Sequence, residues 1–163
     1  MARRKSRQQR VPNLASDNRI ARWCGHQKLD RDPVTHSVRG IIPQALELRL
    51  HLNESYISAS WLEFHSGDDL SRLRKVAAVY RADGRRLGPN GGFALLNVGA
   101  ILDAGTARSR ELRVTNRPSR ADPAYAKVEG LPQDNSDMVL LSMLCDACRG
   151  VYLMGDIDGG GSA

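Results

Sequence analysis

Leucine occupies every second position between residues 46 and 52, and a polar side chain follows each leucine. The intervening residues are Glu47, Arg49, His51 and Asn53. A helix would distribute these leucines around its axis, whereas an extended chain places them all on one face. The pattern therefore predicts a strand over residues 46–53 with one apolar face.

The next stretch, residues 56–65, reads YISASWLEFH and alternates with a change of phase. Apolar residues fill the odd-numbered positions up to Trp61 and then switch to Leu62 and Phe64. We expect a strand that pairs antiparallel with the leucine segment through a short turn. The change of phase predicts that this strand leaves the core near Leu62, through a bulge.

A helical period begins shortly afterwards. Apolar positions recur at spacings of three and four, at Leu70, Leu73, Val76, Ala77 and Tyr80. This spacing predicts an amphipathic helix. Ser66 or Asp68 would cap its start, and Gly84 would end it in the left-handed conformation.

A second helix is predicted over SDMVLLSMLCDACRG, residues 136–150, with Ser136 as the cap and Gly150 past the end. Its expected inner side carries Met138, Leu141, Leu144, Cys145 and Cys148. Three further segments read as strands: FALLNVGAIL at 93–102, RELRVTN at 110–116 and AYAKVEG at 124–130. VYLM at 151–154 would add an edge strand.

This order predicts an α+β fold, with a mostly antiparallel sheet of about five or six strands and two helices packed on one face. Residues 17–155 would form a single domain, and residues 156–163 a flexible Gly-rich tail. Residues 1–16 lack the apolar residues needed to bury area, so we expect a disordered arm there.

The charge of the chain is concentrated in that arm. The net charge is +6, from 24 basic and 18 acidic residues. Five cations lie within the first ten residues: Arg3, Arg4, Lys5, Arg7 and Arg10. Without them 19 basic residues remain against 18 acidic ones, so the rest is nearly neutral. The arm is therefore a candidate contact for a nucleic-acid backbone or an acidic protein partner, and a solubilising tail is the alternative.

No apolar run approaches 18 residues, so the sequence predicts no membrane contact. The odd count of three cysteines does not suggest a secreted disulfide framework, and we expect a cytoplasmic protein.

Cys24-x-His26 and Cys145-x-x-Cys148 together offer three sulfurs and an imidazole, a full tetrahedral set for zinc. The alternative is that these cysteines pack as small apolar residues, because Cys145 and Cys148 fall within a helical apolar repeat. The alternative carries more weight, and no cofactor is expected beyond this possible zinc.

Glu63 and His65 are two residues apart and would share one face of a strand, where a carboxylate can orient an imidazole. His51, on the polar side of the neighbouring leucine segment, could join them as a general acid/base site. The alternative is the polar end of a strand that meets water. No nucleophile-elbow, metalloprotease, phosphate-loop or dinucleotide motif is present.

Three functions follow. The first is a non-catalytic binding or accessory protein that contacts a protein partner or nucleic acid, with the arm supplying electrostatic attraction. The second is a small hydrolase-type enzyme with its site at His51, Glu63 and His65. The third is a zinc-stabilised nucleic-acid-binding module. The sequence alone ranks these in that order.

Overall fold

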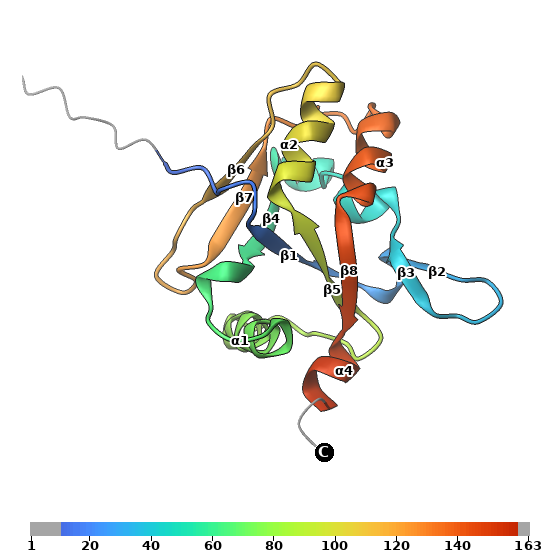
Figure 1. Cartoon of the computed structure of the whole chain (residues 1–163), viewed down its shortest axis with the longest axis vertical. Helices are drawn as coiled ribbons and strands as arrows, with labels where there is room; N and C mark the ends of the chain where they lie inside the picture. Colours follow the sequence, from blue (N-terminus) through green and yellow to red (C-terminus); the bar gives the residue numbers. More distant parts are fainter. Residues whose placement is uncertain (1–10, 160–163) are drawn as a thin grey trace, which may run out of the picture.

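The computed structural model describes residues 11–159 and confirms the α+β class. Within that range, six strands form one antiparallel sheet in the order β6-β7-β4-β1-β5-β8, and β2 and β3 form a separate hairpin (Figure 1). The strands are β1 (Arg19–Cys24), β2 (Leu29–Arg31), β3 (Val38–Ile41), β4 (Tyr56–Trp61), β5 (Gly92–Asn97), β6 (Arg113–Asn116), β7 (Tyr125–Glu129) and β8 (Cys148–Leu153).

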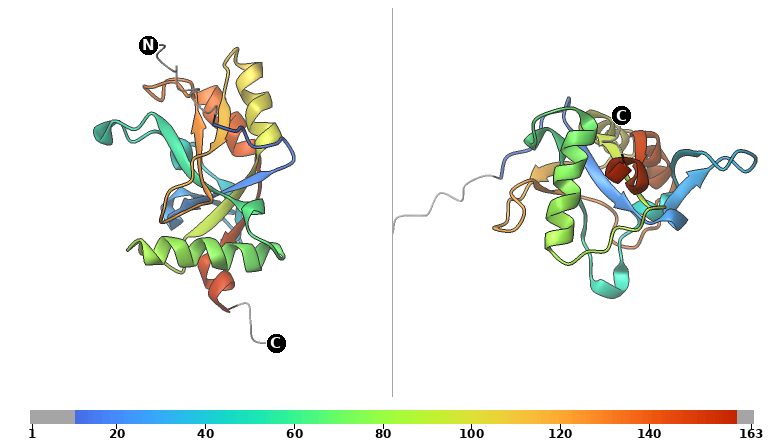
Figure 2. Two further views of the ribbon diagram at one scale, coloured as in Figure 1. Left: turned by 90° about the vertical axis from the view of Figure 1, so that its left-hand side faces the viewer. Right: turned by 90° about the horizontal axis from the view of Figure 1, so that it is seen from below.

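The helices lie on both faces of the sheet, not on one face as expected. They are α1 (Asp69–Ala82), α2 (Val98–Ala107), α3 (Met138–Asp146) and α4 (Met154–Gly159). One core forms between the sheet and α2 and α3, and a second, smaller core forms between the opposite face and α1 and α4. Figure 2 accordingly shows α1 and α4 at one end of the molecule and α2 and α3 at the other.

The sheet has a seam between β1 and β4. Along its whole length β1 pairs with β5, but it pairs with β4 only through Ile20↔Trp61 and Ala21↔Ser60. The earlier part of β4 pairs with β7 alone. The strands β1 and β4 therefore diverge beyond Ala21, and the sheet opens there.

The predicted leucine strand is wrong. The segment instead forms two 3-10 helices, η2 (Pro43–Leu46) and η3 (Leu50–Leu52), joined by extended residues. Leu46 and Leu48 are buried, whereas Leu50 and Leu52 are 47% and 55% exposed. The predicted hairpin with residues 56–65 is therefore wrong as well.

The change of phase after Trp61 has a simple structural cause. The strand β4 ends there, and the 3-10 helix η4 (Leu62–Phe64) follows directly. This turn rotates the chain so that Leu62 becomes fully buried against α1. The apolar side chains therefore change face because the strand gives way to a 3-10 helix, and not because of the expected bulge.

The first predicted helix is confirmed as α1. An oxygen of the Asp68 carboxylate accepts a hydrogen bond from the backbone N–H of Ser71, at 2.8 Å, which caps the first turn. Past the other end, Gly84 has a φ of 82°, a conformation that glycine adopts without a Cβ clash.

The apolar run at 93–102 splits into two elements. Residues up to Asn97 belong to β5, and α2 begins directly after it. The Asn97 side-chain oxygen accepts a hydrogen bond from the backbone N–H of Ala100, at 2.9 Å, so Asn97 caps α2. The sequence interpretation as one strand missed this helix.

The later predicted helix is α3, shorter than expected. Asp137 caps it in place of Ser136, and Met138 is 47% exposed instead of facing inwards. The helix ends at Asp146, and Cys148 already belongs to β8, the expected edge strand.

Both ends of the described chain are more ordered than predicted. The backbone N–H of Leu14 donates to the carbonyl of Val114, at 2.9 Å, so residues 11–16 of the expected arm run beside the outer edge of β6. The start of the expected tail lies in α4, where Ile157 is fully buried. The rest of the arm and tail, residues 1–10 and 160–163, lies outside the described range.

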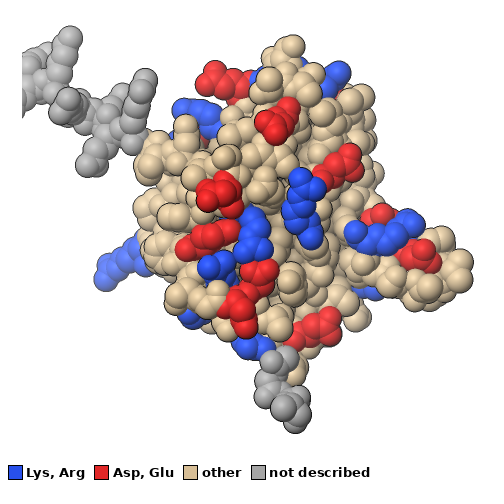
Figure 3. Space-filling model, in the orientation of Figure 1, with Lys and Arg blue, Asp and Glu red and all other residues tan. Residues whose placement is uncertain are grey.

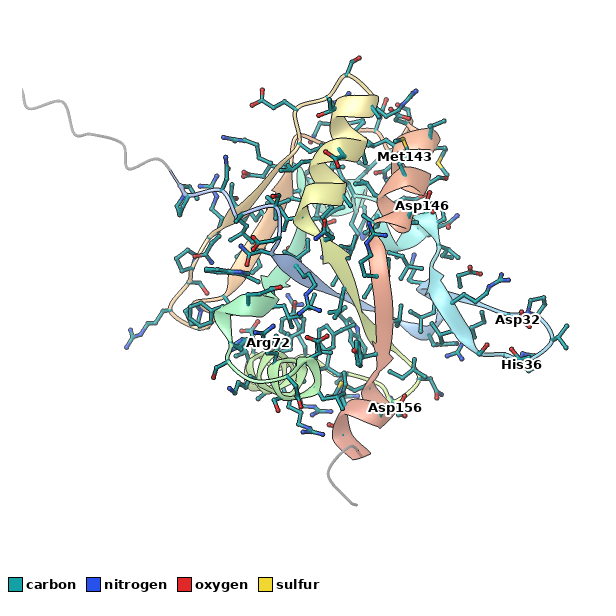
Figure 4. The ribbon with its side chains drawn as sticks, viewed as in Figure 1. Asp32, His36, Arg72, Met143, Asp146 and Asp156 are labelled. Atoms are coloured by element: carbon teal, nitrogen blue, oxygen red, sulfur yellow. The ribbon has the colours of Figure 1, made fainter. Side chains whose placement is uncertain are left out.

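The polar region after β1 contains η1 (His26–Lys28) and the β2–β3 hairpin. The loop of this hairpin carries Asp32 and His36 and projects from the body (Figure 4). An oxygen of Asp32 accepts the backbone N–H groups of Val34 and Thr35, which closes the loop. No helix within residues 11–159 is long and apolar enough to span a bilayer.

Candidate anion-binding site

Arg22 lies in the seam between β1 and β4. Its Nη1 donates to the Ser58 carbonyl at 2.9 Å, and its Nε donates to the Ala45 carbonyl at 3.4 Å. Burial lowers the pKa of this guanidinium, because removal from water disfavours the charged form. Among the described residues no carboxylate forms an ion pair with it; two backbone carbonyls accept its hydrogen bonds, and the charge of Glu54 acts on it only from beyond ion-pair distance.

A hollow of about 510 Å³ opens beside this guanidinium. Five cationic residues line it, and we call it the basic hollow: Arg22, Lys28, Arg49, Arg85 and Arg86. One carboxylate, that of Glu47, also lines it. Glu54 does not line the hollow but holds Arg49, because its Oε1 accepts a hydrogen bond from Arg49 Nε at 2.7 Å. The lining therefore carries a clear excess of positive charge.

The basic hollow is a local feature of the charge distribution. On the face shown in Figure 3, Lys and Arg side chains are interspersed with Asp and Glu side chains. Several surface arginines have carboxylate partners, for example Arg39 with Asp30 at 3.1 Å and Arg81 with Asp158 at 2.7 Å. In contrast, Lys28, Arg85 and Arg86 form no such pair with any residue of the range 11–159.

Tyr80, near the end of α1, positions one wall of the hollow. Its ring packs edge-on against Phe93, with centroids 5.5 Å apart, and its hydroxyl accepts from Ser60 Oγ at 3.3 Å. The guanidinium carbon of Arg85 lies 4.4 Å from the ring centroid, a cation–π contact. The end of α1 and the sheet thus hold one cation of the hollow in place.

A second, smaller hollow of about 270 Å³ is also lined by Tyr80 and Arg85. Tyr125 and Asp122 help to line it, and burial raises the pKa of the Asp122 carboxyl. The hydroxyls of Ser58 and Tyr125 are 2.8 Å apart. Since Ser58 lines the basic hollow, this hydrogen bond joins the rims of the two hollows.

The predicted catalytic residues do not form one site. Both oxygens of Glu63 accept the backbone N–H of Arg19 at 3.1 Å, and Oε1 also accepts from Arg19 Nε at 3.0 Å. Arg19 in turn donates to Asp69, so Glu63 fastens β1 to η4 and α1. His51 is exposed in η3, and within residues 11–159 no hydrogen bond, ion pair or ring contact links it with Glu63 or His65.

His65 follows η4 and is partly buried. Burial is the main cause that lowers the pKa of its imidazole, and the nearby charge of Lys75 lowers it further. Its Nε2 is buried without a partner among the described residues, as is Nε of Arg72, which lies on α1 (Figure 4). The surroundings therefore favour a neutral imidazole.

The four residues proposed for zinc lie in different environments. Cys24 is buried in the core, His26 is exposed in η1, and Cys148 donates from its sulfur to the Gly150 carbonyl at 3.4 Å. Burial raises the pKa of Cys24 and of Cys145 to about 11, which disfavours the thiolate that binds metal. Residues 11–159 contain no group of three or more His, Cys, Asp or Glu placed to hold a metal ion.

Comparison with family models, with curated proteins and with solved structures finds no match.

Sequence reasoning missed the basic hollow, although one signal for it exists. In the strand RIARWC, Arg22 shares a face with Ile20 and Cys24, both of which are buried. An arginine on the core side of a strand needs a partner or a polar opening. The cations proposed from the sequence, in residues 1–10, lie outside the described range.

Proposed function

We propose that the protein is a non-catalytic binding protein whose basic hollow binds phosphate groups of a nucleic-acid backbone. The observation that carries this proposal is the guanidinium of Arg22, which is desolvated in the seam and forms an ion pair with no carboxylate of residues 11–159. A partly desolvated charge of this kind costs free energy unless an opposite charge approaches it. A bound phosphate would supply that charge.

The chemistry of the lining supports a phosphate ligand in particular. Four of its five cations are arginines, and a guanidinium presents parallel N–H groups that match two phosphate oxygens. The single lining carboxylate, Glu47, offsets only part of this charge. Because the body of the chain is nearly neutral, attraction would be local to the hollow and to the cations of residues 3–10.

The proposal assigns binding rather than turnover. Glu63 is engaged by Arg19, and His51 is exposed in a separate element. A general acid/base pair needs its members within hydrogen-bond reach of one reacting group. A long, charged ligand bound at several points, in contrast, needs only the distributed cations that the hollow supplies.

The test is the binding of a fluorescent 20-nucleotide single strand, measured by anisotropy between 50 and 200 mM salt. We expect Arg85→Ala/Arg86→Ala to weaken binding about tenfold or more. It should also reduce the slope of log affinity against log salt by about 1.4, or about 0.7 for each lost phosphate contact. The matched control is Arg39→Ala/Arg81→Ala, which removes the same charge from residues paired with carboxylates.

Equal affinity and equal slope for both double variants would overturn the proposal. A third variant, with the five cations of residues 3–10 replaced by glutamine, separates the two basic regions. If that variant alone abolishes binding, the arm and not the hollow holds the ligand, and the proposal for the hollow fails.

A further inference from the structure

Half of the sheet presents a polar, aromatic face to solvent on the side of α1. In β4 and β7, alternate residues are fully buried in the core with α2 and α3, for example Ile57 and Val128. Apart from the buried Ser60, the residues between them point to the opposite face and are only half-buried. We call four of them the tyrosine surface: Tyr56, Ser58, Tyr125 and Lys127.

The antiparallel register brings these four side chains together. Ser58 pairs with Lys127 across the strands, and Tyr56 and Tyr125 lie on either side of that pair. The ammonium of Lys127 is 3.8 Å from the ring centroid of Tyr56 and 5.9 Å from that of Tyr125. The surface therefore combines two rings with one cation, and within residues 11–159 that cation has no carboxylate partner.

The tyrosine surface and the basic hollow share a rim. Ser58 lines the hollow, and its hydroxyl is 2.8 Å from the hydroxyl of Tyr125. Residues 11–14 run along the outer edge of β6, two strands away from β4. The chain therefore runs along the β6 edge of this half of the sheet, directly after residues 3–10, which carry the five cations.

We infer that the nucleic acid bound by this protein is single-stranded, with its phosphates in the basic hollow and its bases stacked on Tyr56 and Tyr125. The inference rests on the proposed function and specifies its ligand. Bases of a single strand expose their faces to aromatic side chains, whereas a duplex keeps them stacked on each other. The adjoining positive charge makes this surface complementary to a strand that carries both phosphates and bases.

Lys127 gives the surface a way to accept a base. Its ammonium lies over the Tyr56 ring but is only half-buried, and its flexible stem allows it to turn towards a phosphate. A base then takes its place on the ring, while the charge stays beside the backbone of the ligand. Readout of sequence is not expected, because stacking on a ring is available to every base.

The experiment uses the full chain and three probes with the same fluorophore: a 20-nucleotide thymidine strand, an abasic strand of the same length, and a 20-base-pair duplex. We expect the thymidine strand to bind at least about tenfold more tightly than either of the others. Tyr56→Leu should reduce its affinity about tenfold without changing that of the abasic strand. Tyr56→Phe, which keeps the ring, should restore tight binding.

The outcomes separate the two proposals. Equal affinity for thymidine and abasic strands, tighter binding of the duplex, or an unaffected Tyr56→Leu variant would overturn the single-strand inference. If the abasic strand still binds and Arg85→Ala/Arg86→Ala still weakens it, the hollow keeps its function. If no probe binds, both fail. An unfolding curve for Tyr56→Leu with the wild-type midpoint excludes misfolding as the cause of a loss.

Discussion

Replacing Glu63 by alanine should destabilise the protein substantially, because Glu63 holds β1 in place. Its carboxylate accepts the backbone N–H of Arg19 with both oxygens and the Nε of the same residue with one. Arg19 also donates from Nη1 and Nη2 to Asp69, at 2.9 and 2.8 Å. Without Glu63, one backbone donor and one guanidinium donor lose their acceptor.

The magnitude follows from the number of bonds and their exposure. A hydrogen bond to a charged group contributes about 1.5–3 kcal/mol, and two are lost. The side chains of Arg19 and Glu63 are 26% and 22% exposed, so water replaces part of each bond. We therefore expect a loss of about 2 kcal/mol, or about 4–8 °C in melting temperature for a domain of this size. Glu63→Gln, which keeps one acceptor, should lose about half as much.

Urea unfolding, followed by tryptophan fluorescence, measures this loss directly. The control is Asp158→Ala, which removes the exposed ion pair with Arg81 and should cost at most about 1 kcal/mol. If Glu63→Ala unfolds within 0.5 kcal/mol of the wild type, by the same measurement, the interpretation of Glu63 as a structural anchor is wrong.

The remaining predictions concern packing and titration. Leu62→Ala should cost about 3 kcal/mol in urea unfolding, whereas the exposed Leu52→Ala should cost about 0.5 kcal/mol or less. Hydrogen bonds from Arg19 depress the pKa of Asp69, so its stabilisation is present above the unfolded pKa of about 3.9 and is lost as the pH falls through the lower folded value. In Asp69→Asn, the free energy of unfolding should therefore depend less steeply on pH below about pH 4. By NMR, the folded-state pKa of His65 should lie below its unfolded value of about 6.5. Stability should therefore fall as the pH drops from the unfolded pKa through the folded one. An identical pKa for His65 in urea would contradict this.

Periodic segments could be predicted from the sequence, and segments that change conformation could not. The spacing of apolar residues predicted α1, and the alternatives Ser66 and Asp68 for its cap and Gly84 for its end bracketed it, because these signals are encoded locally. The alternating leucines misled the prediction, since a period of two also fits two short 3-10 turns joined by extended residues. Pro43 at the start of η2 and Asn53, with a φ of 54°, mark this alternative.

The candidate site was largely hidden from sequence analysis, because its cations come from segments far apart in the chain. Arg22 lies in β1, Lys28 in η1, Arg49 between η2 and η3, and Arg85 and Arg86 in the loop after α1. No spacing along the chain connects them. They meet because β1 and β4 diverge, and that divergence depends on pairing between strands, which a single sequence does not reveal.

The central place of β1 in the sheet has a consequence for how the protein folds during synthesis. This strand is the earliest of the six in the chain, yet its neighbours are β4 and β5, and the second of these ends only at Asn97. A ribosome therefore releases the apolar Ile20 and Ala21 long before any neighbouring strand exists to shelter them. Sheet formation must wait for distant contacts, which slows folding and leaves the nascent chain exposed to aggregation.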